Sequence, residues 1–217
     1  MTTPADTSGA GMPAGSVPLT SVPQDAPVDR ATAAARRVVE ALLLTDRANA
    51  NLERVAEELN GIAEHLEQHA PAVRDRMVDM WGGEGVTRHD PVTGLENAIA
   101  LPLIVYGLPD GSVRGETTVT IPYQGPPGCV HGGVSALLLD HTLGVANMWA
   151  GRDGMTAQLN VRYHRPTPLF EPLQINGRQE SVDGRKIRTT GDIRTAEGEV
   201  CVSVEGLFVD KKVPRPR

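Results

Sequence analysis

The run His131-Gly132-Gly133, followed seven residues later by Asp140, holds the residue types best suited to catalysis. It comes directly after a sharp Gly-Pro-Pro-Gly turn at 125–128. Glycines at the start of a helix allow close backbone approach and leave unpaired N–H groups at the positive end of the helix dipole. Such a corner suits a developing oxyanion. Asp140 follows three leucines, where a carboxylate is costly, so it is a candidate general base or nucleophile.

Each of these residues also has a purely structural interpretation. Asp140 could cap a neighbouring turn, and His131 could be a hydrogen-bonding residue of the glycine turn. Cys129 with His131 and Asp140 imitates a thiol triad, but residues so close in sequence do not readily converge, which favours a small buried cysteine. A metal site is not expected, since Asp140 and His141 point to different faces of a helix.

One long apolar helix and several strands must position these groups. Residues 134–150 are apolar and free of proline, which predicts a buried helix. A β-branched strand is expected at 117–123, and extended segments follow at 156–164, 172–181 with 185–195, and 200–209. Asp183-Gly184 is a strong turn signal between strands. A strand, one central helix and then an antiparallel meander predict an α+β fold.

The first strand after the helix carries a further candidate site residue, Thr156. Simple alternation over 156–164 puts one set of polar side chains on a single face. That set is Thr156, Gln158, Asn160, Arg162 and His164. The alternation therefore predicts that the Thr156 hydroxyl shares its face with two basic or near-basic groups.

The N-terminal third of the chain differs in composition. Residues 1–27 are rich in Pro, Gly, Ser, Thr and Ala, which predicts a disordered tail. Residues 28–86 are expected to form a helical arm, either a helical pair or one long broken helix. An apolar stripe at helical spacing runs along it through Leu52, Val55, Ala56, Leu59, Ile62, Ala63 and Leu66. This arm either packs on the main domain or binds a partner.

Composition excludes several classes of protein. The 217 residues carry a formal net charge of -6 and only 3% aromatic residues, which argues against a nucleic-acid partner. No apolar run approaches the ~20 residues of a membrane-spanning helix. Two cysteines are too few for a disulfide scaffold. A cytoplasmic protein is expected.

The motif VHGG, followed by LLLD, MTAQLNVRYHRPTPL and DGRK, resembles the hotdog-fold acyl-CoA thioesterases. The similarity is to the phenylacetate-degradation type and to mammalian thioesterase superfamily members, and it covers residues 90–210. It implies an antiparallel sheet wrapped around one long central helix, with a hotdog domain at 87–212. The helical arm is not explained by the shared motifs.

The resemblance also assigns roles to particular residues. It implies that the Gly132 N–H polarises a thioester carbonyl and that Asp140 acts as general base or nucleophile. Thr156 would orient the water, and Gln124 would help to hold the carbonyl. The implied substrate-binding residues are His131, Gly133, Arg162, His164 and a coenzyme A clamp of Gly184, Arg185 and Lys186.

These observations together predict an acyl-CoA thioesterase that needs no cofactor. Few aromatic residues are available, so a medium or long fatty acyl chain is expected, as in fatty acid and lipid metabolism. The alternatives are a hotdog hydratase or dehydratase, and a non-catalytic acyl-CoA-binding or scaffold protein. Gly132 and Asp140 lie roughly 12 Å apart along one helix, too far for one thioester, which predicts a site shared in a homodimer or dimer of dimers.

Overall fold

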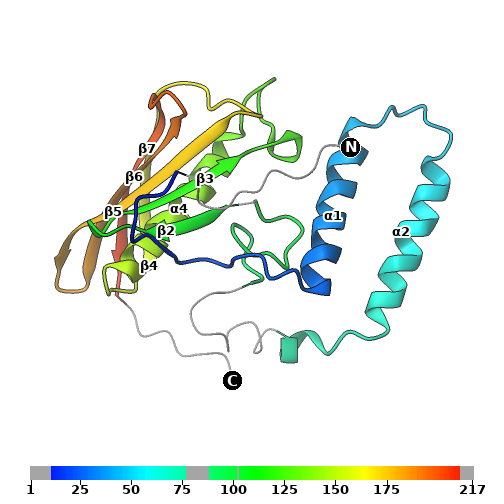
Figure 1. The fold of residues 1–217 in the computed structure, drawn as a ribbon, viewed down its shortest axis with the longest axis horizontal. Coiled ribbons are helices and arrows are strands. Elements are labelled where there is room, and N and C mark those ends of the chain that lie inside the picture. The colour runs from blue at the N-terminus through cyan, green and yellow to red at the C-terminus, as the bar shows by residue number, and fades with distance from the viewer. Residues whose placement is uncertain (1–10, 77–87, 102, 211–217) are drawn as a thin grey trace.

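The computed structural model describes residues 11–76, 88–101 and 103–210. Its centre is one seven-stranded antiparallel sheet in the order β1-β2-β3-β5-β6-β7-β4. The strands are β1 Val17–Pro18, β2 Ile104–Gly107, β3 Val113–Thr118, β4 Met155–Tyr163, β5 Pro172–Asp183, β6 Lys186–Thr195 and β7 Val200–Val209. Helix α4, Gly132–Trp149, packs against one face of this sheet (Figure 1). The predicted antiparallel sheet around one long central helix is confirmed.

The core lies between α4 and the sheet because both elements are apolar there. Leu138, Leu139 and Leu143 of the helix are fully buried against Ile175 and Val202 of the sheet. The expected turn at Asp183-Gly184 joins β5 to β6, with Gly184 at a positive φ of 56°. The strand expected at 117–123 begins and ends earlier, since Pro122 lies in a short 3-10 helix, η1, at Ile121–Tyr123.

A glycine lets α4 approach the middle of the sheet. A Cβ added to Gly191 would lie 2.5 Å from the backbone oxygen of Asn176 and 2.9 Å from Cδ2 of Leu143. We expect Gly191→Ala to lower the free energy of unfolding by about 1–3 kcal/mol, because the backbone of the neighbouring strand would have to shift to make room for the methyl group. Urea denaturation measures this change. Gly61→Ala is the matched control, since nothing lies within 4 Å of that position, and an equal loss there would contradict the packing explanation.

The segment before the arm is ordered where a disordered tail was predicted. Val17 and Pro18 pair with Gly107 and Tyr106 of β2, and the Thr20 hydroxyl accepts a hydrogen bond from the Val105 N–H at 3.0 Å. The prediction for 1–27 is therefore wrong over this stretch, because its prolines and threonines are compatible with a short edge strand. Residues 1–10 lie outside the described part of the chain.

The arm is a helical pair, α1 at Pro27–Leu44 and α2 at Leu52–Glu67, which run side by side beyond the sheet (Figure 1). Helix α1 touches η1, while α2 buries none of its residues and leaves Ile62 59% exposed. Asp29 at the start of α1 forms an ion pair with Arg88, which also binds Glu96 at 2.6 Å. The arm is thus joined to the main domain through α1.

Candidate active site

The glycine corner is built by the end of the turn and the first residues of α4. His131 is the N-cap, and its ring Nδ1 accepts a hydrogen bond from the Gly133 N–H at 3.0 Å. The Gly132 N–H has no hydrogen-bond acceptor among the described residues. It stands at the positive end of an 18-residue helix. This N–H is therefore available to a ligand oxygen, as the sequence predicted.

Asp140 lies two turns further along α4 and meets Thr156 at the start of β4. The Thr156 hydroxyl donates a hydrogen bond to Oδ1 of Asp140 at 2.8 Å. Asp140 is only half-buried, whereas the sequence suggested a carboxylate isolated among leucines. The difference arises because Leu138 and Leu139 face the sheet, while Leu137 is 39% exposed.

The two halves of the predicted site open into different cavities. Gly132 lines one of about 330 Å³ together with Tyr163 and His164. Asp140 and Thr156 line another of about 460 Å³ together with His141. No described residue lines both cavities. Within one chain the Gly132 N–H and the Asp140 carboxylate therefore do not face the same space.

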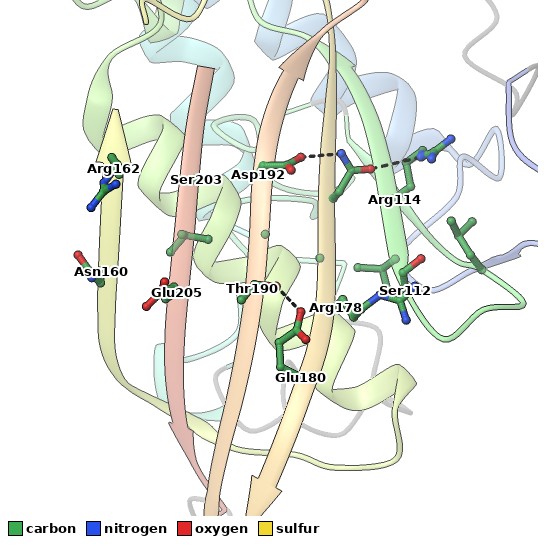
Figure 2. A pocket seen from close by; sticks show the side chains of 16 residues that line it. Ser112, Arg114, Asn160, Arg162, Arg178, Glu180, Thr190, Asp192, Ser203 and Glu205 are labelled. Atoms are coloured by element: carbon green, nitrogen blue, oxygen red, sulfur yellow. Dashed lines mark hydrogen bonds between the residues drawn. The ribbon is translucent and has the colours of Figure 1, made fainter. Parts of the chain in front are cut away.

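A β-bulge corrects the predicted faces of β4. Thr156 pairs with Phe208 of β7, but Gln158 pairs with Leu207, so Ala157 is an extra residue that reverses the alternation. Thr156 consequently faces α4 and Asp140. Asn160 and Arg162 pair with Glu205 and Ser203 on the opposite face (Figure 2).

Arg162 is therefore not part of this site, contrary to the prediction. It lines a polar cavity of about 530 Å³ on the outer face of the sheet, with Asn160, Glu205 and Thr190 (Figure 2). His164, which directly follows β4, lines the Gly132 cavity, and its Nε2 lies 2.8 Å from the Ser203 hydroxyl.

The remaining predicted residues flank the two halves. Gln124 is exposed before the glycine turn, and its Oε1 accepts a hydrogen bond from the Gly128 N–H at 3.4 Å. Arg185 and Lys186 follow Gly184 at the β5–β6 turn. The Arg185 Nε donates to the Asp210 carbonyl oxygen at 2.9 Å. Since Lys186 pairs with Val209, which also pairs with Met155, this turn lies two strands from Thr156.

Three polar contacts near the site, made by Tyr163 and His141, were missed by the sequence reasoning. The Tyr163 hydroxyl donates to the Gly132 carbonyl oxygen at 2.8 Å and steadies the helix start. His141, beside Asp140, has its Nε2 3.2 Å from the Thr93 hydroxyl and its Nδ1 3.8 Å from Asp90. Burial lowers the pKa of His141, so the imidazole is neutral at pH 7. The chain has only three tyrosines, and this rarity could have drawn attention to Tyr163. No local sequence pattern indicated the contact with Thr93.

Over the described ranges, no three His, Cys, Asp or Glu side chains are grouped to hold a metal ion. None of the described helices combines the length and the apolar character needed to cross a membrane.

Two family models match separate parts of the chain. The family model "Thioesterase superfamily" matches residues 127–202. A model described as "Hypothetical protein RHA1_ro05818, N-terminal helical domain" matches residues 19–75. The crystal structure of protein RHA08564, a thioesterase superfamily protein, is 75% identical with a TM-score of 0.84. That match covers 89% of this chain and 96% of the other.

Curated relatives match over part of the chain. The acyl-coenzyme A thioesterases THEM4 of Bos taurus and Xenopus laevis are 37% and 40% identical over 90 residues, which is 41% of this chain. Those matches span 37% and 40% of the relatives' own lengths, so the chain covers about two fifths of these proteins.

Proposed function

The chain belongs to the thioesterase superfamily, and on that premise we propose that it hydrolyses acyl-CoA to a free acid and coenzyme A. The observation that carries this proposal is the hydrogen bond from Thr156 to Asp140 at 2.8 Å, beside an open cavity. It gives the carboxylate a fixed orientation. The curated relatives named acyl-coenzyme A thioesterases support the choice of substrate.

The arrangement suits attack on a thioester carbonyl. Thr156 donates its hydroxyl hydrogen to Asp140, so its oxygen is free to accept a hydrogen bond from a water molecule. Asp140 then takes the proton from that water as general base, or attacks the carbonyl carbon itself. The carbonyl oxygen becomes an oxyanion that the Gly132 N–H stabilises. Collapse breaks the C–S bond. In the general-base route, the coenzyme A thiolate takes up the proton that Asp140 removed from water. In the nucleophilic route, the acyl group stays on Asp140 as an anhydride, which water hydrolyses to the free acid while the thiolate takes up the proton released.

A second copy of the chain completes this site. Gly132 and Asp140 of one chain line different cavities, as described above. We infer that two α4 helices pack alongside in opposite senses, so that each Asp140 meets the partner's Gly132. Such a two-fold arrangement creates two equivalent sites.

A thiol-release assay tests the proposed function. Purified full-length chain is incubated with acetyl-, octanoyl-, palmitoyl- and phenylacetyl-CoA, and free thiol is followed with a colorimetric reagent. Release from the octanoyl or palmitoyl substrate is expected, since we propose a medium or long aliphatic chain. Tight binding of these thioesters without thiol release would favour a non-catalytic acyl-CoA-binding protein instead.

The β5–β6 turn is expected to bind the coenzyme A phosphates. Removing both charges with Arg185→Ala and Lys186→Ala should raise KM about tenfold while kcat changes less, because uniform binding is lost. Steady-state kinetics at two salt concentrations measure this, and salt should weaken wild-type binding in the same direction. Arg47→Ala with Arg54→Ala removes the same charge from the arm. An equal rise of KM in that control would contradict a specific clamp.

A further inference from the structure

A cavity of about 530 Å³ lies between helix α1 of the arm and the segment that leads to the glycine corner. Its lining is mainly apolar: Val39, Ala98, Ile99, Ala100, Pro122 and Tyr123. Ligand sites in proteins are typically concave, mostly apolar and roughly 300–1,000 Å³ in volume. The arm therefore does more than cover the domain, because it encloses a space of ligand size.

Hydrogen bonds fix the positions of the segments that form the walls of this cavity. The Arg36 guanidinium on α1 donates hydrogen bonds to the carbonyl oxygens of Gly94 at 3.0 Å and Asn97 at 2.7 Å. On the opposite wall, the Tyr123 hydroxyl donates to the Ile99 carbonyl oxygen at 2.8 Å. With the Asp29–Arg88 ion pair at the start of α1, these bonds fix the helix without filling the space beneath it.

The wall of this cavity is directly joined to the glycine corner. The Tyr123 carbonyl oxygen accepts a hydrogen bond from the His131 N–H at 2.9 Å. His131 is the residue before Gly132, whose N–H is the proposed oxyanion donor. One backbone hydrogen bond thus joins the wall of the apolar cavity to the glycine corner.

Three charged residues also line the cavity. Arg37 also lines it, is exposed, and forms no ion pair within the described ranges. Arg36 and Arg37 outnumber Glu40, the acidic residue of the lining. The apolar lining, and not these charges, suits the uncharged distal end of an aliphatic acyl chain.

We propose that this cavity binds the distal part of an aliphatic acyl chain of the substrate, and that α1 sets the accepted chain length. This inference rests on the proposed function. The arm would then be a specificity element, with Val39 as a wall residue rather than a catalytic one.

Non-hydrolysable thioethers test this inference without relying on turnover. Affinities of the full-length chain for S-methyl-CoA and S-dodecyl-CoA are measured by titration calorimetry. Each buried methylene contributes about fourfold in affinity, so the wild type should prefer the dodecyl compound strongly. Val39→Trp should fill the cavity and reduce that preference at least tenfold, with S-methyl-CoA binding unchanged.

A valine on the same helix supplies the control. Val28 is 42% exposed, Val39 is 41% exposed, and Val28 does not line the cavity. Val28→Trp should keep the wild-type preference. If circular dichroism shows that Val39→Trp is poorly folded, Ala98→Leu narrows the cavity from the opposite wall and should give the same loss.

The outcomes separate this inference from the function on which it rests. An unchanged dodecyl preference in folded Val39→Trp and Ala98→Leu would overturn the acyl-chain site, whatever the thiol-release result. Free dodecanoate that binds in a Val39-dependent way, while S-dodecyl-CoA does not, would make the cavity a separate lipid site and also overturn it. Normal thioether binding without thiol release would reject hydrolysis alone.

Discussion

Replacing Asp140 with Asn is expected to lower kcat for acyl-CoA hydrolysis by roughly 10²–10⁴-fold, the usual contribution of a positioned acid or base. The amide keeps the shape of the side chain and can still accept the Thr156 hydrogen bond. It cannot take a proton from water or attack the carbonyl as a carboxylate. Binding of S-dodecyl-CoA should survive, which separates loss of chemistry from loss of the fold.

Asp153 offers a matched control for this substitution. It lines the same cavity as Asp140, and its carboxylate makes no hydrogen bond to Thr156. Asp153→Asn should therefore leave kcat within about threefold of wild type, as expected for a residue outside the reacting centre. Wild-type turnover by Asp140→Asn, or an equal loss in Asp153→Asn, would reject Asp140 as the catalytic carboxylate.

Mixing two inactive chains is expected to restore activity. One chain carries Asp140→Asn, and the other carries Gly132→Val, which places a side chain over the oxyanion corner. A Cβ added at Gly132 would lie 3.4 Å from the Tyr163 ring, which is an ordinary van der Waals contact, so the variant should fold. If each site takes Gly132 from one chain and Asp140 from the other, a mixed dimer holds one intact site.

The size of the recovery follows from random pairing. Half of the dimers are mixed and half of their sites work, so about a quarter of wild-type activity should return from parents reduced at least 10²-fold. Thiol release after subunit exchange measures it, and mass spectrometry verifies the mixed dimers. Verified mixed dimers that stay inactive, or a fully active monomer, would contradict the shared site.

Local sequence patterns were sufficient for the elements whose signals are local. The proline-free apolar run predicted α4, and the glycine pair predicted a free N–H at its start, because helix ends follow from a few neighbouring residues. The partnership of Asp140 and Thr156 came from the resemblance, and the structure brings the two side chains together at 2.8 Å.

Long-range features were beyond such patterns. Strict alternation placed Arg162 beside Thr156, but the bulge at Ala157 moved it to the other face of the sheet. A bulge is defined by pairing with β7, which the residues of β4 alone do not encode. The contact of His141 with Thr93 joins positions 48 residues apart, so it depends on the complete fold.

The short strand β1 has a consequence for how copies of this chain can join. It pairs with β2 and itself becomes the edge of the sheet, so along the described chain β4, at the opposite edge, is the one long strand with a free edge. A sheet with two free edges can add copies head to tail without limit, and such growth produces fibres. At the β1 edge only two residues can pair, and Pro18 has no backbone N–H to donate, so pairing along a full strand is restricted to β4 against β4, which closes after two chains. We therefore expect the short, proline-containing edge at β1 to disfavour open-ended polymerisation.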